Sequence, residues 1–147
     1  MKVLDMYEWI AGNMSDFIRP FQENENLYTQ AKKFWRSLEN YSVVSVVVFI
    51  IIAVVAAYWY YKPFNNQTGR HYHPKYWLFF WLGAFLASLL ITFGLEYAFC
   101  EPKLDGAMLL EFKIAFGNAI YTAVLYLIIS IVWCNALPTN AYRYFKK

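Results

Sequence analysis

Charge is scarce in this chain: Asp, Glu, Lys and Arg together make up 16% of its 147 residues. A soluble domain usually carries about 25% charged residues, so the shortage argues against a protein that folds in water alone. The formal net charge is only +3, and the basic residues stand beside apolar runs instead of forming one block. Nucleic-acid binding needs a concentrated basic surface, so no nucleic-acid partner is expected, whereas contact with lipid headgroups fits this distribution.

Cysteine and histidine are also rare, with two residues of each. Cys100 ends the second of the three apolar runs described below, and Cys134 ends the third. Consecutive membrane spans run in opposite directions, which would hold the two thiols about 30 Å apart, whereas a disulfide needs Cα atoms within about 7 Å. The histidines form His71-x-His73 in a loop that offers no third metal ligand. We therefore expect no intrachain disulfide, no metal site and no cofactor.

Signatures of catalysis are missing from the sequence. It contains no nucleophile elbow, P-loop, dinucleotide fingerprint or zinc-binding helix motif. No small-molecule substrate is indicated, and we expect a protein that is not an enzyme. A secretory signal is missing as well, because Asp5, Glu8 and Asp16 interrupt the apolar character of the N-terminus. The first membrane-targeting segment is then expected at residues 41–61.

Long apolar runs are what the sequence does contain. A helix needs about 20 consecutive apolar residues to cross a hydrocarbon core of roughly 30 Å. Three runs without proline meet that requirement: Tyr41–Tyr61, Tyr76–Phe99 and Ile114–Trp133. The sequence predicts an all-α integral membrane protein with three transmembrane helices, preceded by an amphipathic N-terminal helical segment. We expect this segment at 1–40 and the transmembrane domain, with a short basic tail, at 41–147, in a multi-pass protein of a bacterial or mitochondrial inner membrane.

The N-terminal segment is predicted to be helical because its apolar residues recur every three or four positions. The repeat consists of Val3, Tyr7, Ile10, Met14, Phe17 and Phe21, and continues in phase with Tyr28, Ala31, Trp35 and Leu38. Gly12-Asn13 and Pro20 should divide it into two or three short helices. Asn24–Asn26 should cap a helix that begins near Leu27 and continues into the first run. The apolar stripe could lie on the membrane surface or against a partner subunit, and both alternatives remain open.

Aromatic and basic residues flank the runs, as expected at a membrane interface. Residues predicted to contact headgroups are Lys32, Lys33, Arg36, Arg70, His71 and His73. Three spans place the N-terminus and second loop on one side, and the first loop and tail on the other. The first side carries five basic residues near the spans and the second carries six. This small difference favours a cytoplasmic C-terminus.

The second run carries two small-residue pairs on one helical face, Gly83 with Ala87 and Gly94 with Ala98. We call these four residues the small-residue seam. Pairs of small residues four positions apart let two membrane helices approach closely, so the seam is predicted to pack against a helix of this chain or of another copy.

Polar residues follow other faces of the second and third runs. Ser88, Thr92 and Glu96 are spaced four apart on the second run, and Asn118 and Thr122 are four apart on the third. Polar and ionisable residues inside a span either bind a neighbouring helix or line a water path. These five are therefore candidates for pore lining or for interhelical hydrogen bonds. Glu96 could also be an interfacial carboxylate or pair with Lys113.

Two functions remain open at this stage. The first is a non-enzymatic structural or anchoring subunit of a larger membrane complex, such as a secretion apparatus or respiratory-type assembly. Its partners would be the lipid bilayer and other membrane subunits. The alternative is a self-assembling homo-oligomeric ion channel or pore-forming membrane effector, in which each copy would contribute its polar stripe to the pore.

Overall fold

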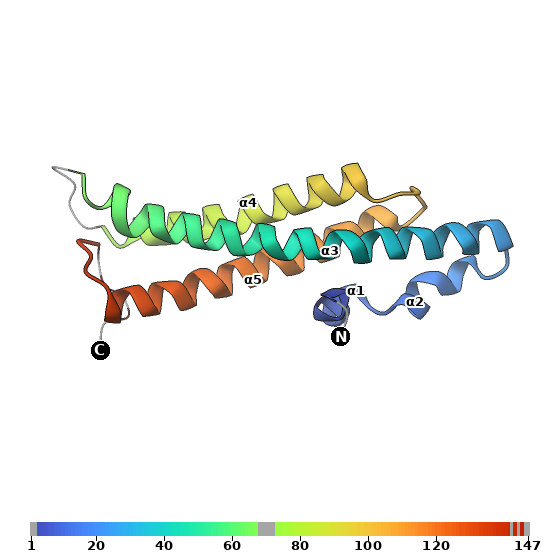
Figure 1. The fold of residues 1–147 in the computed structure, drawn as a ribbon, viewed down its shortest axis with the longest axis horizontal. Coiled ribbons are helices and arrows are strands. Elements are labelled where there is room, and N and C mark those ends of the chain that lie inside the picture. Colours follow the sequence, from blue (N-terminus) through green and yellow to red (C-terminus); the bar gives the residue numbers. More distant parts are fainter. Residues whose placement is uncertain (1–2, 68–72, 142, 144, 146–147) are drawn as a thin grey trace. The chain divides into compact units, whose positions relative to one another are not determined.

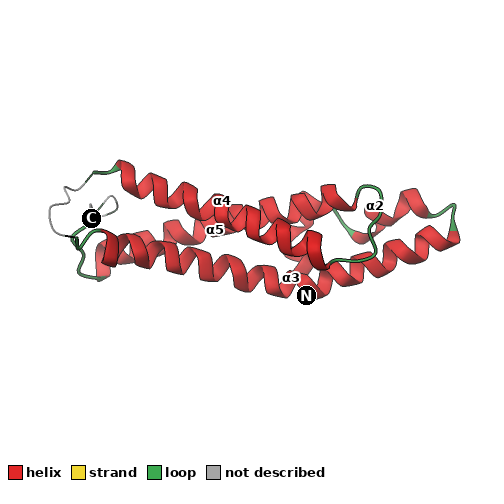
Figure 2. Cartoon of the chain, turned by 90° about the horizontal axis from the view of Figure 1, so that it is seen from above, coloured by secondary structure: helices red, strands yellow, loops and turns green. Residues whose placement is uncertain are grey.

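The structure, a computed structural model, describes residues 3–67, 73–141, 143 and 145. These residues form helices and connecting loops, without a strand among them (Figure 1, Figure 2). Three helices are long and apolar enough to cross a membrane: α3 (Glu25–Trp59), which continues into the π-helical turn η3 (Tyr60–Phe64), α4 (Lys75–Phe99) and α5 (Ala107–Ala136). The prediction of an all-helical chain with three such helices is confirmed.

The helix α3 begins where the asparagines predicted it. The Asn24 side chain accepts hydrogen bonds from the backbone N–H groups of Asn26, at 3.1 Å, and Leu27, at 3.3 Å. It thereby satisfies two donors that the first helical turn would leave unpaired. No glycine or proline interrupts the helix before η3, which contains Pro63. The capped helix therefore passes directly into the first apolar run, as expected.

Residues 3–21, which we call the N-terminal arm, fold into short helical pieces as predicted. These pieces are η1 (Val3–Tyr7), α1 (Glu8–Ala11), α2 (Met14–Ile18) and η2 (Arg19–Phe21). Gly12 separates α1 from α2 with a φ of 77°, a left-handed conformation that favours glycine. Asn13 then caps α2 by accepting from the backbone N–H of Asp16 at 3.1 Å.

Contacts divide the chain into two compact units. Unit 1 comprises Met1–Val48 and Leu89–Asn118, and unit 2 comprises Phe49–Ser88 and Ala119–Lys147. Each of the three long helices contributes residues to both units. The boundary predicted between residues 40 and 41 falls inside α3. The division into an N-terminal segment and a transmembrane domain concerns placement in a membrane and stays a prediction.

The second loop and the tail each form a hydrogen bond with a helical segment of the same unit, as is expected when three consecutive helices alternate in direction. In unit 1 the backbone N–H of Glu101, in the second loop, donates to the Ser37 hydroxyl of α3 at 3.4 Å. In unit 2 the Thr139 hydroxyl, in the tail, donates to the Tyr61 carbonyl at 3.0 Å. The second loop therefore lies beside the N-terminal half of α3, and the tail lies beside the first loop.

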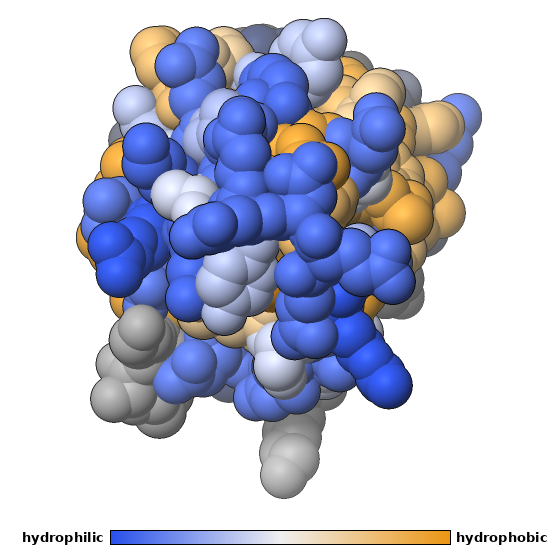
Figure 3. All heavy atoms as spheres, turned by 90° about the vertical axis from the view of Figure 1, so that its right-hand side faces the viewer, coloured by the Kyte–Doolittle hydropathy of each residue, from blue (hydrophilic) through white to orange (hydrophobic). Residues whose placement is uncertain are grey.

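The apolar stripe of the N-terminal segment is largely covered by its own chain. Tyr7, Ala31, Trp35 and Leu38 are buried, and the ring of Phe17 lies 5.9 Å from that of Trp35. Between the arm and α3, the turn at residues 22–24 carries exposed polar side chains, and the molecule seen from that side is largely hydrophilic (Figure 3). These contacts hold the arm within unit 1, and placement of the segment on a membrane surface or against a partner stays a prediction.

Candidate functional site

The five polar residues predicted as pore-lining or interhelical side chains are all buried. Ser88, Thr92, Glu96, Asn118 and Thr122 have at most 1% of their surface exposed. Unit 1 contains Thr92, Glu96 and Asn118, whereas unit 2 contains Ser88 and Thr122. Their partners are described for each unit in turn.

In unit 2, polar side chains bind α4 to α5. The Thr122 hydroxyl donates to Ser88 Oγ at 2.7 Å. Two tryptophans of α4 also donate to α5: Trp77 Nε1 to Ser130 Oγ at 3.1 Å, and Trp81 Nε1 to the carbonyl oxygen of Ala123 at 3.0 Å. Such bonds between membrane helices contribute about 0.6–2 kcal/mol each. The polar residues of unit 2 thus join two helices of one chain.

In unit 1, the Asn118 side chain joins four segments. Its Nδ2 donates to the carbonyl oxygen of Ser45 on α3 at 3.0 Å and to Thr92 Oγ1 on α4 at 3.1 Å. Its Oδ1 accepts from the hydroxyl of Tyr7 in η1. Both N–H donors and the amide oxygen therefore have partners, which a buried amide requires.

Close approach of the arm to α5 depends on a glycine. A Cβ atom at Gly117 would lie 3.1 Å from Cδ1 of Tyr7 and 3.5 Å from Cγ2 of Ile10. The missing side chain allows the Tyr7 ring to reach Asn118 at the next position. Sequence reasoning placed Tyr7 on the apolar stripe but did not identify its hydroxyl as a partner of Asn118. The sequence signal was a glycine directly before the one amide in the third run, about one turn inside its start.

Two buried carboxyl groups lie close together in unit 1, and we call Glu96 and Glu111 the acidic pair. Glu96 is 1% exposed and accepts from Ser45 Oγ at 2.9 Å. Glu111 is fully buried, and its Oε1 accepts from Lys103 Nζ at 2.8 Å. The two carboxyl groups interact electrostatically. Among the described residues, neither Oε2 has a hydrogen-bond partner.

The cation of this cluster is Lys103, from the second loop, and not Lys113. Lys113 forms no ion pair with Glu96 among the residues described and lines a shallow surface pocket with Asp16. Glu96 is buried instead of standing at an exposed interface. In the described residues, Glu96 is therefore neither an exposed carboxylate nor the ion-pair partner of Lys113.

A buried thiol adjoins the acidic pair. Cys100 follows α4 and is fully buried, with its backbone N–H bonded to the Glu96 carbonyl at 2.9 Å. Burial raises the pKa of the Cys100 thiol to about 12, and Glu96 and Glu111 add to the rise. Cys134, in unit 2, is also buried, and both cysteines are free.

The small-residue seam lies on the outside of α4. Gly83, Gly94 and Ala98 are exposed, Ala87 is half-buried, and no described atom comes within 4 Å of a Cβ built at either glycine. Packing of the seam against another chain stays a prediction. Small residues that unit 2 buries in one cluster with Tyr126 include Ala53 and Ala57 of α3 and Ala84 of α4. Ala53 and Ala57 are themselves four apart, a signal that sequence reasoning missed.

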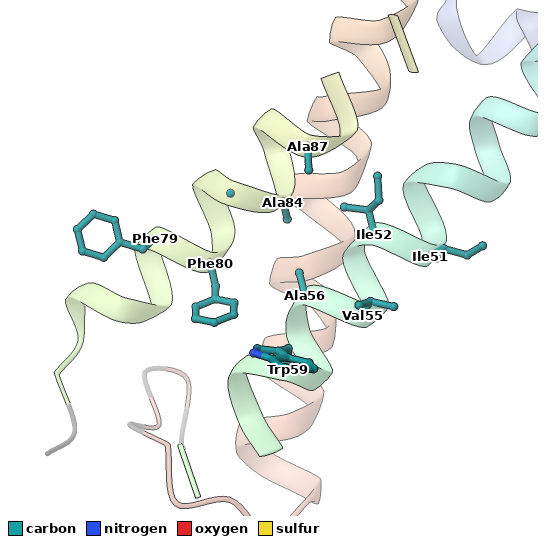
Figure 4. A pocket seen from close by; sticks show the side chains of 10 residues that line it. Ile51, Ile52, Val55, Ala56, Trp59, Phe79, Phe80, Ala84 and Ala87 are labelled. Atoms are coloured by element: carbon teal, nitrogen blue, oxygen red, sulfur yellow. The ribbon is translucent and has the colours of Figure 1, made fainter. Parts of the chain in front are cut away.

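Beside the seam, unit 2 contains an open apolar groove between α3 and α4, which we call the α3–α4 groove. It encloses about 520 Å³. Its lining residues are Ile51, Ile52, Val55, Ala56, Trp59, Phe79, Phe80, Gly83, Ala84 and Ala87. Trp59 and Phe80 project into the space between the two helices, and alanines of both helices lie along it (Figure 4). The groove therefore presents small and aromatic apolar groups to whatever surrounds the protein.

The residues predicted to contact headgroups lie at scattered positions. Lys33, Arg36 and His73 are exposed, and Lys32 is half-buried with its Nζ 4.1 Å from the centroid of the Tyr28 ring. Arg70 and His71 lie outside the described residues. Headgroup contact by these six residues stays a prediction.

The described residues offer oxygen and nitrogen groups for hydrogen bonding, but no cluster of metal ligands. No three side chains of His, Cys, Asp or Glu come together as a metal site in the part of the chain that the structure describes. Hydrogen bonding, proton binding and apolar docking are the chemistry that this arrangement can provide. Comparison of the chain with protein-family models, with curated proteins and with solved structures finds no match.

Proposed function

We propose that this protein is a non-enzymatic anchoring subunit of a larger membrane complex, inserted through α3, α4 and α5. The observation that carries the proposal is the open α3–α4 groove with the uncovered Gly83 at its edge. The preferred occupant is a transmembrane helix of another subunit. The complex would be of the secretion-apparatus or respiratory type, in a bacterial or mitochondrial inner membrane.

Insertion in a bilayer is supported by the apolar surface that the long helices leave uncovered. In the most apolar 18-residue stretch of each helix, only 28% of the residues are buried in α3, 17% in α4 and 50% in α5. Each Å² of apolar surface left in water costs about 25 cal/mol, a penalty that lipid removes. Leu90, for example, is 68% exposed on α4. Such a surface fits lipid and other membrane helices better than water.

The bonding of the polar residues supports an anchor over a channel. A homo-oligomeric pore would need Ser88, Thr92 or Asn118 to face a water path shared between copies. Each of these side chains instead bonds to another helix of the same chain. Polar groups satisfied in this way hold three helices together and leave the apolar exterior available for partners.

A helix is the preferred occupant of the groove because of the residues on its α4 side. Gly83 and Ala87 present almost no side chain, so a second helix backbone can approach α4 closely and gain van der Waals contact. Trp59 and Phe80 provide large apolar surfaces against which that helix can pack. Lipid chains would fill the same space without requiring small residues.

The test is site-specific photocrosslinking in the native host, with a crosslinking amino acid at Gly83. The matched control places it at Ile128, which is also apolar and exposed but lies on α5 outside the groove. We expect a defined protein adduct from Gly83 and none from Ile128. Adducts at both positions, or at neither, would contradict docking in the groove.

A second variant separates docking from folding. Gly83→Leu should reduce co-purification of the crosslinked partner at least tenfold, because the side chain enters the groove. The unfolding free energy of the isolated protein should not fall, since nothing described lies within 4 Å of the new Cβ and leucine favours a helix more than glycine does. If the adduct contains only copies of this chain, and the reconstituted protein conducts ions, the channel replaces the anchor as the function.

A further inference from the structure

We infer that the acidic pair, Glu96 and Glu111 with the single cation Lys103, binds one exchangeable proton and that Glu96 holds it. This inference goes beyond the anchoring function and does not depend on it. It stands on the burial of two carboxyl groups, the positions of their partners, and the two oxygen atoms that have none.

The charges in the cluster do not balance when both carboxyl groups are ionised. Lys103 neutralises Glu111 through a contact of 2.8 Å. Glu96 has only one identified donor, the Ser45 hydroxyl, for a carboxyl group with 1% of its surface exposed. An unpaired charge in a low-dielectric interior costs several kcal/mol, so the group takes up a proton instead. One proton removes the excess charge.

The partners of the two carboxyl groups place the proton on Glu96. Glu111 receives a charged ammonium donor from Lys103, whereas the donor identified for Glu96 is the neutral Ser45 hydroxyl, a weaker partner for a carboxylate. Two nearby carboxylates also repel each other, so that one of them binds a proton more tightly. The unpartnered Oε2 of Glu96 offers a site for the proton.

The groups facing Glu96 come from every element around it. The α3 helix contributes the Ser45 hydroxyl and α5 contributes Glu111. The segment after α4 contributes the Cys100 thiol, which stays protonated because burial raises its pKa to about 12. The arm contributes the Tyr7 hydroxyl to Asn118, which lies on the same helix as Glu111. Lys103 is therefore the one cation identified in this group of described residues.

Exchange of the proton with solvent is supported by the position of Lys103. Its side chain is 43% exposed, while the Glu111 carboxyl that it contacts is fully buried. The ammonium group thus connects the buried pair to the surface at the second loop. A proton can enter or leave on that side when the ion pair between Lys103 and Glu111 opens.

The test is infrared difference spectroscopy of the purified full-length protein during a pH titration. We expect the C=O stretching band of a protonated carboxylic acid, with the amplitude of one group, to be present at neutral pH. Glu96→Gln should abolish this band. The control Glu101→Gln removes an exposed carboxyl group from the same loop and should leave the band unchanged.

A second variant covers the case in which Glu96→Gln does not fold. Ser45→Ala keeps both carboxyl groups but removes the hydroxyl that donates to Glu96, so the band should persist to a pH higher by about one unit. Absence of the band in the wild type at neutral pH, or its full retention in folded Glu96→Gln, would overturn the inference.

Discussion

At the scale of single residues, unit 1 depends on an amide whose hydrogen-bonding groups all have partners. Asn118 contacts Tyr7, Ser45 and Thr92, which belong to three other helical segments. Removing a buried polar partner costs about 1–3 kcal/mol for each group left unpaired. Asn118 therefore specifies which helices meet in unit 1, whereas apolar contacts alone would tolerate several registers.

The Cys100 thiol should be almost inert in the folded protein. Burial raises its pKa from an ordinary 9.0 to about 12, so the thiolate fraction at pH 8 falls about 1000-fold. Because the thiolate reacts, alkylation of Cys100 by iodoacetamide should slow by at least that factor relative to the unfolded chain. The measurement is the rate of mass increase of Cys134→Ala at pH 8, with and without denaturant.

A control for this prediction lies next to the thiol. Glu101→Cys, made with both native cysteines replaced by alanine, presents an exposed thiol and should react at nearly the unfolded rate. The raised pKa of Cys100 also means that the folded state resists deprotonation, so stability should decline as the pH rises from about 9 towards 12. Equal alkylation rates for folded and unfolded Cys100 would contradict both statements.

At the scale of elements, the N-terminal arm packs closely against α5 because Gly117 has no side chain. A leucine there would overlap the Tyr7 ring, since even its Cβ would lie 3.1 Å from Cδ1 of Tyr7. Overpacking of this kind costs about 1–3 kcal/mol. We expect Gly117→Leu to release the arm and to speed amide hydrogen exchange in residues 3–21 about tenfold or more. Exchange measured by mass spectrometry tests this prediction.

The matched control is Gly94→Leu, which adds the same side chain where no described atom lies within 4 Å of the new Cβ. Exchange in the arm should then equal that of the wild type. The prediction fails if Gly117→Leu leaves the arm protected. It also fails if α3, α4 and α5 exchange faster by the same factor, because the variant would then have unfolded unit 1 as a whole.

Most of the helical elements could be predicted from the sequence, because each depends on local chemistry. The start of α3 follows from the Asn24 side chain, and the break after α1 follows from Gly12. Which face of α4 points inward could not be predicted in the same way. Helical spacing defines the small-residue seam and the polar stripe as different faces, but only tertiary contacts decide that Ser88 is buried and Gly83 exposed.

The contacts of the candidate site were harder to predict than its members. The five polar residues of α4 and α5 were identified from their helical spacing. Their partners Ser45 and Tyr7 stand 51 and 111 positions away from Glu96 and Asn118, respectively. The predicted site did not include Lys103. This residue lies in the second loop, where no helical periodicity indicates which way a side chain points. Contacts between distant segments carry no signature in a single sequence.

At the scale of the whole molecule, the described residues include polar side chains in the interior and many large apolar side chains on the surface. Buried side chains such as Ser88, Asn118 and Glu111 face other parts of the chain, while large apolar residues such as Leu90 are exposed. Large contiguous apolar patches are uncommon on the surfaces of proteins that fold in water. In a bilayer, the exposed apolar groups meet lipid or other helices, and the interior polar groups hold the helices together.

If α3, α4 and α5 all cross a membrane, the two ends of the chain lie on opposite sides of it, and single introduced cysteines can test this. Glu23→Cys lies in the exposed turn before α3, and Asn140→Cys lies in the exposed tail. Both native thiols are buried, so the wild-type chain should give no background. With a cytoplasmic C-terminus, an impermeant maleimide should label Glu23→Cys in intact cells and Asn140→Cys only after permeabilisation.

The labelling pattern tests the number of spans and their orientation separately. The number of positions labelled in intact cells reports whether the number of spans is odd or even, and the identity of the labelled position reports the orientation. An odd number of spans requires one position, and only one, to react in intact cells. Labelling of both positions, or of neither, would mean an even number of spans and would contradict the topology. Labelling of Asn140→Cys alone would keep the three spans but reverse the orientation, because the six basic residues near the first loop and tail exceed those opposite by only one.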